Sequence, residues 1–253
     1  MKTIWIHRLA LVMVLLGLCF SPASPPSAPP AGTGRKALAA SLPGVYAFIA
    51  NEGQYYAPGP GYRFDFGAEG VQLLMGETAL HLDFLGARAA QPLGEAPLAA
   101  RVNVFRGNDP AQWRTDIPTY GQLRYAELYP GIDLVYAPGS ELLKTTFYLE
   151  PEADVSHIQM RYRGAERLWV DETGALRIPF AGGDLRESPP VAYQEIAEAR
   201  VPVAVSFELR DPHTYGFAIA GDYDPRYSLV IDPSLDYSTY LGGSSAEAGN
   251  AIA

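Results

Sequence analysis

The sequence predicts an all-β domain, an antiparallel and sandwich-like fold of roughly a dozen strands. Three observations carry this prediction. Apolar residues recur at every second position in most segments after residue 45, which is the period of half-buried strands. Turn residues separate these segments at intervals of about 8–12 residues, as in sandwiches. No window keeps a helical period, so helices supply no layer of the core.

The alternating segments follow one another along the domain. A hairpin is predicted where Leu168 and Val170 lead through Asp171–Gly174 into the next strand, because Gly174 tolerates a positive φ. Two single turns of helix are predicted, at 108–113, with an Asn or Asp cap, and at 153–157. The alternating strands are expected, in chain order, at 62–66, 80–84, 143–149, 158–162, 168–170, 176–180, 201–209, 215–219 and 229–231.

The N-terminus predicts a signal peptide over residues 1–23. A short basic stretch precedes an apolar run of about twelve residues at 9–20, whereas a membrane-spanning helix needs roughly 20. Small residues, Ser21 and Ala23, suit cleavage after Ala23. The alternatives are a retained membrane anchor and a lipoprotein cut before Cys19. The lipoprotein is disfavoured because the large Leu18 precedes the cysteine.

The composition of the chain after the predicted signal peptide limits which classes of protein it can belong to. Residues 24–44 are rich in Pro, Ser and Gly and predict a flexible linker. The only cysteine lies in the signal, so the mature chain would hold no disulfide. Removing Lys2 and Arg8 leaves 19 − 2 = 17 basic against 28 acidic residues, a balance of −11. This acidity argues against nucleic acid and anionic lipid as partners, and no integral membrane segment is expected after cleavage.

The composition shifts near the C-terminus. After Asp232-Pro233 a new alternating segment begins, followed by the turn Gly242–Ser245. We expect the all-β domain to occupy 45–233, and 234–253 to be the truncated start of a second domain. On this expectation, deletion from Ser234 onward would cost less than about 2 kcal/mol.

Seven phrases of the chain, in order, resemble the uncharacterised N-terminal β domain of secreted and surface proteins with SBBP (β-propeller) repeats. The resemblance covers about residues 45–253, with one departure, at Pro138–Ser140. It implies secretion, an all-β domain, the start of a β-propeller repeat at 234–253, and no catalytic residues to carry over. The phrases are 48–54, 105–110 with 113–115, 117–120, 128–136, 189–195, 222–225 with 229–233, and 237–243.

The only residues that the sequence suggests for a binding site are carboxylates. Asp222, Asp224 and Asp232 could supply oxygen ligands to Ca²⁺, although Asx-turn hydrogen bonding is the commoner use of such residues. No catalytic or cofactor-binding residue stands out, and the four histidines are isolated. The aromatic residues Trp113, Tyr129 and Tyr193 are predicted to be core rather than ligand platforms.

These patterns lead to a functional expectation. The chain is predicted to be a non-catalytic structural or interaction module of an extracellular or cell-surface repeat protein. Its partners would be an extracellular protein or a glycan, together with a C-terminal propeller of the same chain. The alternative is an accessory domain of a secreted, carbohydrate-active hydrolase whose active site lies in a missing C-terminal part.

Overall fold

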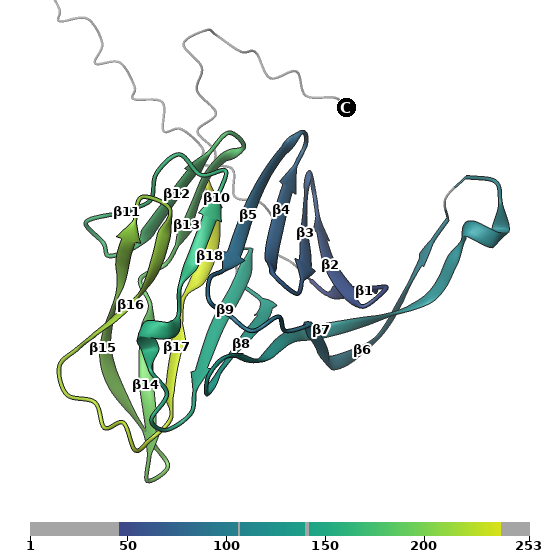
Figure 1. Ribbon diagram of the computed structural model, residues 1–253. Coiled ribbons are helices and arrows are strands. Elements are labelled where there is room, and N and C mark those ends of the chain that lie inside the picture. The colour runs from purple at the N-terminus through teal and green to yellow at the C-terminus, as the bar shows by residue number, and fades with distance from the viewer. Residues whose placement is uncertain (1–45, 106, 140–141, 239–253) are drawn as a thin grey trace, which may run out of the picture. The chain divides into compact units, whose positions relative to one another are not determined.

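The computed structural model describes residues 46–105, 107–139 and 142–238, and the all-β prediction is confirmed for them (Figure 1). The only helices in these ranges are two 3₁₀ turns, Pro110–Gln112 and Val155–His157, where the sequence predicts single turns. Asp109 and Asp154 cap them by accepting bonds from backbone N–H groups. No described helix is long and apolar enough to cross a membrane.

The strands run in chain order along the described part of the chain. The first nine are β1 (Phe48–Asn51), β2 (Gln54–Gly59), β3 (Tyr62–Gly67), β4 (Gly70–Met75), β5 (Thr78–Phe84), β6 (Leu93–Val104), β7 (Arg114–Tyr129), β8 (Ile132–Pro138) and β9 (Leu143–Leu149). The other nine are β10 (Met160–Arg163), β11 (Trp169–Val170), β12 (Leu176–Phe180), β13 (Gly183–Glu187), β14 (Val191–Ile196), β15 (Ala199–Asp211), β16 (Thr214–Ala220), β17 (Leu229–Asp232) and β18 (Ser234–Ser238).

The antiparallel pairing closes on itself. Starting from β1, neighbours pair in the order β2, β3, β4, β5, β10, β16, β15, β14, β17, β9, β8 and β7, and β7 pairs again with β1. We call this closed set the ring. Closure leaves its member strands with few free edges, which limits edge-to-edge aggregation.

Two sets of strands branch from the ring. One is the hairpin of β6 and β7, whose outer half extends beyond the strands that flank its base (Figure 1). The other is the branch of β11, β12, β13 and β18, which joins the ring where β18 pairs with β9. The predicted hairpin at 168–180 forms the start of this branch, with Gly174 at φ +83°.

Aromatic side chains fill the space between opposite walls of the ring. Phe66 on β3 lies 5.3 Å from Tyr136 on β8, and Phe84 on β5 lies 5.2 Å from Tyr125 on β7, as ring centroids. Such edge-on and tilted pairs stabilise a core beyond the area that they bury. The core is therefore one continuous layer between two packed faces, as expected for a sandwich-like fold.

The expected domain boundary after Pro233 falls inside the sheet. β18 pairs with β13 through 184–187 and with β9 through Ser234 and Leu235. Leu235 is buried with the core. The sheet therefore continues to Ser238, because β18 supplies backbone partners for the edge of β13 that β12 does not pair. The expected turn at 242–245 and the signal and linker at 1–44 lie outside the described residues.

On β14 the residues that face the core are not those predicted, since Tyr193 is predicted from the sequence to be buried. Val191 is exposed and Tyr193 is half-buried, whereas Ala192 and Gln194 face the core. The buried amide of Gln194 explains the inversion, because it donates to the backbone oxygens of Asp224 and Tyr227 and accepts from the N–H of Asp224. Tyr193 instead lies under the guanidinium of Arg200.

Candidate functional site

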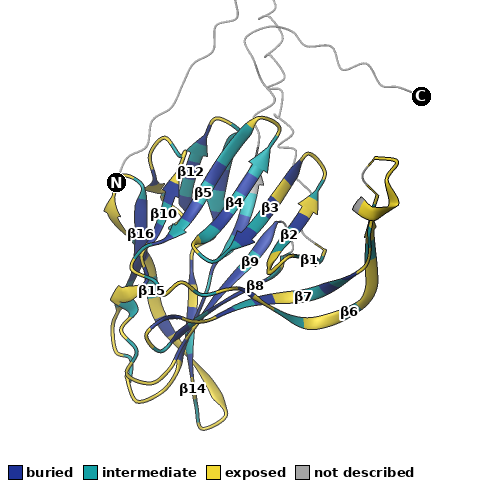
Figure 2. Cartoon of the chain, turned by 45° about the vertical axis from the view of Figure 1, so that its right-hand side comes forward, coloured by how far each residue is buried: buried dark blue, intermediate teal, exposed yellow. Residues whose placement is uncertain are grey.

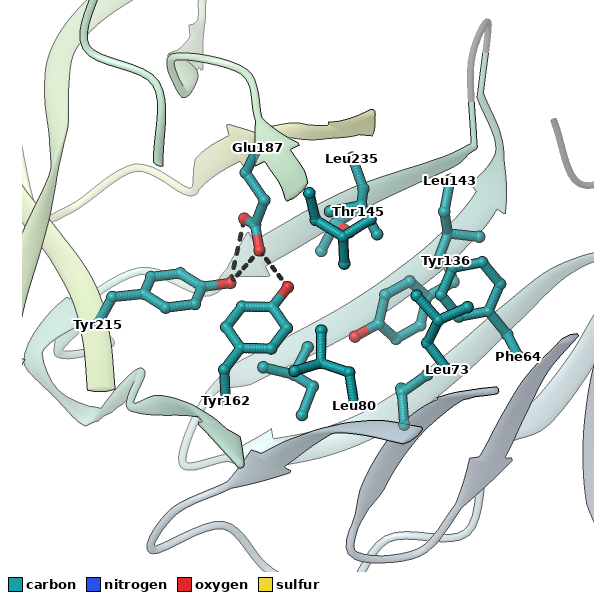
Figure 3. Close-up of a pocket in the computed structure, with 13 residues that line it drawn as sticks. Phe64, Leu73, Leu80, Tyr136, Leu143, Thr145, Tyr162, Glu187, Tyr215 and Leu235 are labelled. Atoms are coloured by element: carbon teal, nitrogen blue, oxygen red, sulfur yellow. Dashed lines mark hydrogen bonds between the residues drawn. The ribbon is translucent and has the colours of Figure 1, made fainter. Parts of the chain in front are cut away.

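A buried carboxyl group lies inside the ring. Glu187, the last residue of β13, is 4 % exposed. Its carboxylate accepts hydrogen bonds from the hydroxyl of Tyr162 on β10, at 2.7 Å, and from that of Tyr215 on β16, at 2.8 and 3.1 Å (Figure 3). The two phenol rings are stacked, with centroids 6.0 Å apart. Three segments distant in sequence thus meet at one carboxyl group.

Each of the three residues is inward-facing because of strand alternation. Side chains two positions apart on a strand lie on the same face. Each of the three residues is two positions from a buried residue of its own strand: Leu185 for Glu187, Met160 for Tyr162 and Phe217 for Tyr215. The alternation around both tyrosines is visible in the sequence, whereas Glu187 is not among the residues predicted to form a site. The available signal was a carboxylate at an inward position of a short alternating strand.

Burial dominates the electrostatics of this cluster. It raises the pKa of Glu187 to about 7, against the lowering effect of the two tyrosine hydrogen bonds. The pKa values of Tyr162 and Tyr215 are raised well above 10, mainly by burial and then by the nearby carboxyl. The hydroxyls therefore stay protonated, and Glu187 is the group of the cluster that changes charge near neutral pH.

The cluster borders a small internal cavity of about 20 Å³. Tyr136 on β8 points its hydroxyl toward Tyr162 (Figure 3), and within the described residues that hydroxyl has no hydrogen-bond partner. A volume of this size suits one water molecule and no organic substrate. The other lining residues are Phe64, Val71, Leu73, Leu80, Leu82, Leu143, Thr145, Leu185 and Leu235. Most of these side chains are apolar, so Glu187 lies in a largely apolar surrounding.

The second notable feature is the hairpin of β6 and β7, which we call the arm. Its outer ladder joins Arg101 to Pro118 and Val104 to Arg114, and no other described strand pairs with those residues. Its base is braced, because the ring of Tyr120 lies against the backbone of Gly94 and 5.6 Å from the ring of Tyr55. The bracing holds the arm in a defined direction.

Two aromatic residues occupy the tip of the arm. Phe105 is 61 % exposed and Trp113 is 40 % exposed, so the prediction that Trp113 is core is wrong, whereas that for Tyr129 is confirmed. Their rings meet edge to face at 5.1 Å, and the indole N–H of Trp113 donates to the carbonyl of Gly107. Trp113 is exposed because a two-stranded ribbon has no second layer to bury it. Figure 2 shows that the outer part of the arm is mostly exposed.

Arginine side chains pair with acidic residues near the arm and on β5. Arg114 bonds Asn51 at the turn between β1 and β2 and lies 3.9 Å from Glu52. On β5, Asp83 is held by two bonds from Arg163. A groove of about 410 Å³ runs beside this pair. Asp83, one of the carboxylates that line this groove, is thus engaged by a cation.

The structure separates the three calcium candidates. Asp224 binds the guanidinium of Arg226, which lowers its pKa to about 2, and Asp232 pairs with Lys144 at 2.8 Å. Asp222 joins neither pair. Over the described ranges no group of three or more acidic, histidine or cysteine side chains is gathered in a way that could hold a metal ion.

Comparison with known proteins gives one match. A family model described as a domain of unknown function, DUF7948, matches residues 48–234 of the chain. No curated protein and no solved structure matches it. The matched range begins with β1 and ends at the first residue of β18.

Proposed function

The chain belongs to the DUF7948 family of domains of unknown function, and from its geometry we propose that it is a non-catalytic interaction module of a secreted or cell-surface repeat protein. The observation that carries this proposal is the arm, a braced hairpin that presents Phe105 and Trp113 to solvent at its tip. Exposed aromatic residues on a rigid support are typical anchors of protein and glycan interfaces.

The buried cluster supports the non-catalytic part of the proposal. Glu187 is the carboxyl group with a pKa near neutrality, which is the property expected of a general acid or base. Its cavity, however, admits a single water molecule. A group that no substrate can reach is better explained as part of the architecture.

The remaining parts of the proposal rest on the sequence. Secretion is inferred from the signal-peptide pattern at 1–23, and attachment to a repeat array from the resemblance of 237–243 to an SBBP repeat. An accessory role in a secreted hydrolase stays the alternative prediction.

Binding of the fluorescently labelled chain to a printed glycan array and to intact cells of the producing species tests the proposal. The double variant Phe105→Ser with Trp113→Ser is expected to bind at least tenfold more weakly, because aromatic anchors supply most of the energy at such sites. The matched control is Tyr148→Ser with Trp169→Ser, which removes two aromatic residues of 43 % and 44 % exposure away from the arm. Equal binding of both double variants, or no binding of the unaltered chain to either surface, would contradict the proposal.

A further inference from the structure

The branch of β11, β12, β13 and β18 shares few backbone pairs with the ring, although its inward side chains, such as Ile178 and Leu185, are buried in the same core. Its pairing with the ring is the short ladder between Ser234–Leu235 of β18 and Leu143–Lys144 of β9. β13 itself pairs with β12 and β18, and not with β10 or β16, within the described part of the chain. Its polar contact with that wall of the ring is the carboxyl of Glu187 on the hydroxyls of Tyr162 and Tyr215.

The position of Glu187 in β13 makes this contact relevant to β18. Glu187 is the register partner of Leu235, the buried residue of β18 that also lines the cavity. Next to it, Ser188 exchanges two hydrogen bonds with Ser234, which begins β18. Glu187 is therefore directly connected to the start of β18.

The surroundings of the carboxyl are neutral on every side. It faces Tyr162 from β10, Tyr215 from β16 and Tyr136 from β8, with Thr145 of β9 and Leu235 of β18 completing the wall. No lysine, arginine or histidine is among the residues that line this cavity. An ionised carboxylate here has two hydrogen bonds but no compensating charge, which is costly in an apolar interior.

We propose that Glu187 is a proton-operated latch for the branch. The neutral acid holds β13 and β18 against β10 and β16. Loss of the proton places an uncompensated charge inside the ring and favours release of the branch, which hydrates the carboxylate. The pKa of about 7 in the closed state puts this change in the neutral pH range. The latch is independent of the proposed role of the arm.

Hydrogen exchange of the full chain, read by mass spectrometry between pH 5 and pH 8 and corrected for intrinsic rates, tests the latch. With a pKa of about 7 when closed and 4.5 when released, the equilibrium for opening of β13 and β18 rises roughly 70-fold over this range. The Glu187→Gln variant keeps a neutral amide and is expected to lose this dependence. The control Glu195→Gln changes an exposed carboxyl of β14 and is expected to keep it.

Two outcomes would overturn the latch. One is an unchanged pH dependence of β13 and β18 in Glu187→Gln. The other is the same dependence in β3 and β4 as in β13 and β18, which would indicate global opening. If Glu187→Gln fails to fold, Tyr215→Phe gives a second test. The hydrogen bond from Tyr215 lowers the pKa of Glu187, so its loss raises that pKa and must shift the midpoint of the exchange transition to higher pH. An unshifted or lowered midpoint rejects the latch.

Discussion

The hydroxyl of Tyr162 lies 2.7 Å from the carboxylate of Glu187, and both groups are buried. The bond joins β10 of the ring to β13 of the branch. Burial of the carboxyl raises the pKa of Glu187 from 4.5 to about 7, against the lowering effect of this bond, and so makes the stability of the domain depend on pH.

Between pH 4.5 and 7 the folded domain keeps the proton of Glu187, whereas the unfolded chain has lost it. Folding stability from this group is therefore full below pH 4.5, falls as the pH rises to about 7, and is constant above. The expected loss is about 3 kcal/mol. Urea unfolding at pH 5 and pH 8 spans about 2.5 kcal/mol of this loss, and Glu187→Gln should reduce the difference to nearly zero. A domain that is more stable at pH 8 than at pH 5 would refute this assignment.

Removing the hydroxyl from each of the three tyrosines around the cavity is expected to change the free energy of unfolding by different amounts. Tyr162→Phe and Tyr215→Phe each remove a bond to a buried carboxyl and should lower the free energy of unfolding by about 1–3 kcal/mol. Tyr136→Phe removes a hydroxyl without a partner in the described chain and should change it by less than about 0.5 kcal/mol. Chemical denaturation at pH 6 compares them. An equal loss in all three would show that Tyr136 is part of the network.

Deletion of the C-terminal strand is expected to be costly, contrary to the expectation from sequence. Ending the chain at Pro233 removes buried Leu235 and the ladders of β18 with β13 and β9. The free energy of unfolding should fall by more than about 2 kcal/mol. Ending the chain at Ser238 retains these contacts and serves as the control. Two truncations of equal stability would place β18 outside the folded unit.

Gly216 on β16 has no room for a side chain. A Cβ at this position would lie 2.5 Å from the carbonyl oxygen of Ile158, a backbone atom that cannot move aside locally. Gly216→Ala should therefore destabilise the domain by about 2 kcal/mol or more through displacement of β16. Gly61→Ala, where the space is open but φ is +76°, should cost about 1 kcal/mol. Thermal unfolding ranks the two, and the reverse order would be inconsistent with this packing.

The signal-peptide prediction has a direct measurement. Secreted material should begin at Ser24, because cleavage is expected after Ala23. N-terminal sequencing of protein from the culture medium determines this, and a chain that still begins at Met1 would contradict it.

Local periodicity was enough to determine the class of this fold. The alternation of Tyr62, Phe64 and Phe66, or of Tyr215 and Phe217, reports one buried and one exposed face, whatever the neighbouring strand is. The same holds for the caps Asp109 and Asp154, because a cap bonds to backbone only two residues away. Interactions within a few residues can be read from the chain alone.

Tertiary structure decided what depends on distant partners. Trp113 is exposed because the arm has no second layer, and Val191 faces outward because Gln194 finds backbone partners at Asp224 and Tyr227. Closure of the ring pairs Phe48 with Tyr120. The meeting of Glu187 with Tyr162 and Tyr215 joins residues 25 and 28 positions apart. The alternation along each strand marks these three side chains as facing inward. Only the packing of β13 against β10 and β16 brings them into contact and buries the carboxyl, which raises its pKa.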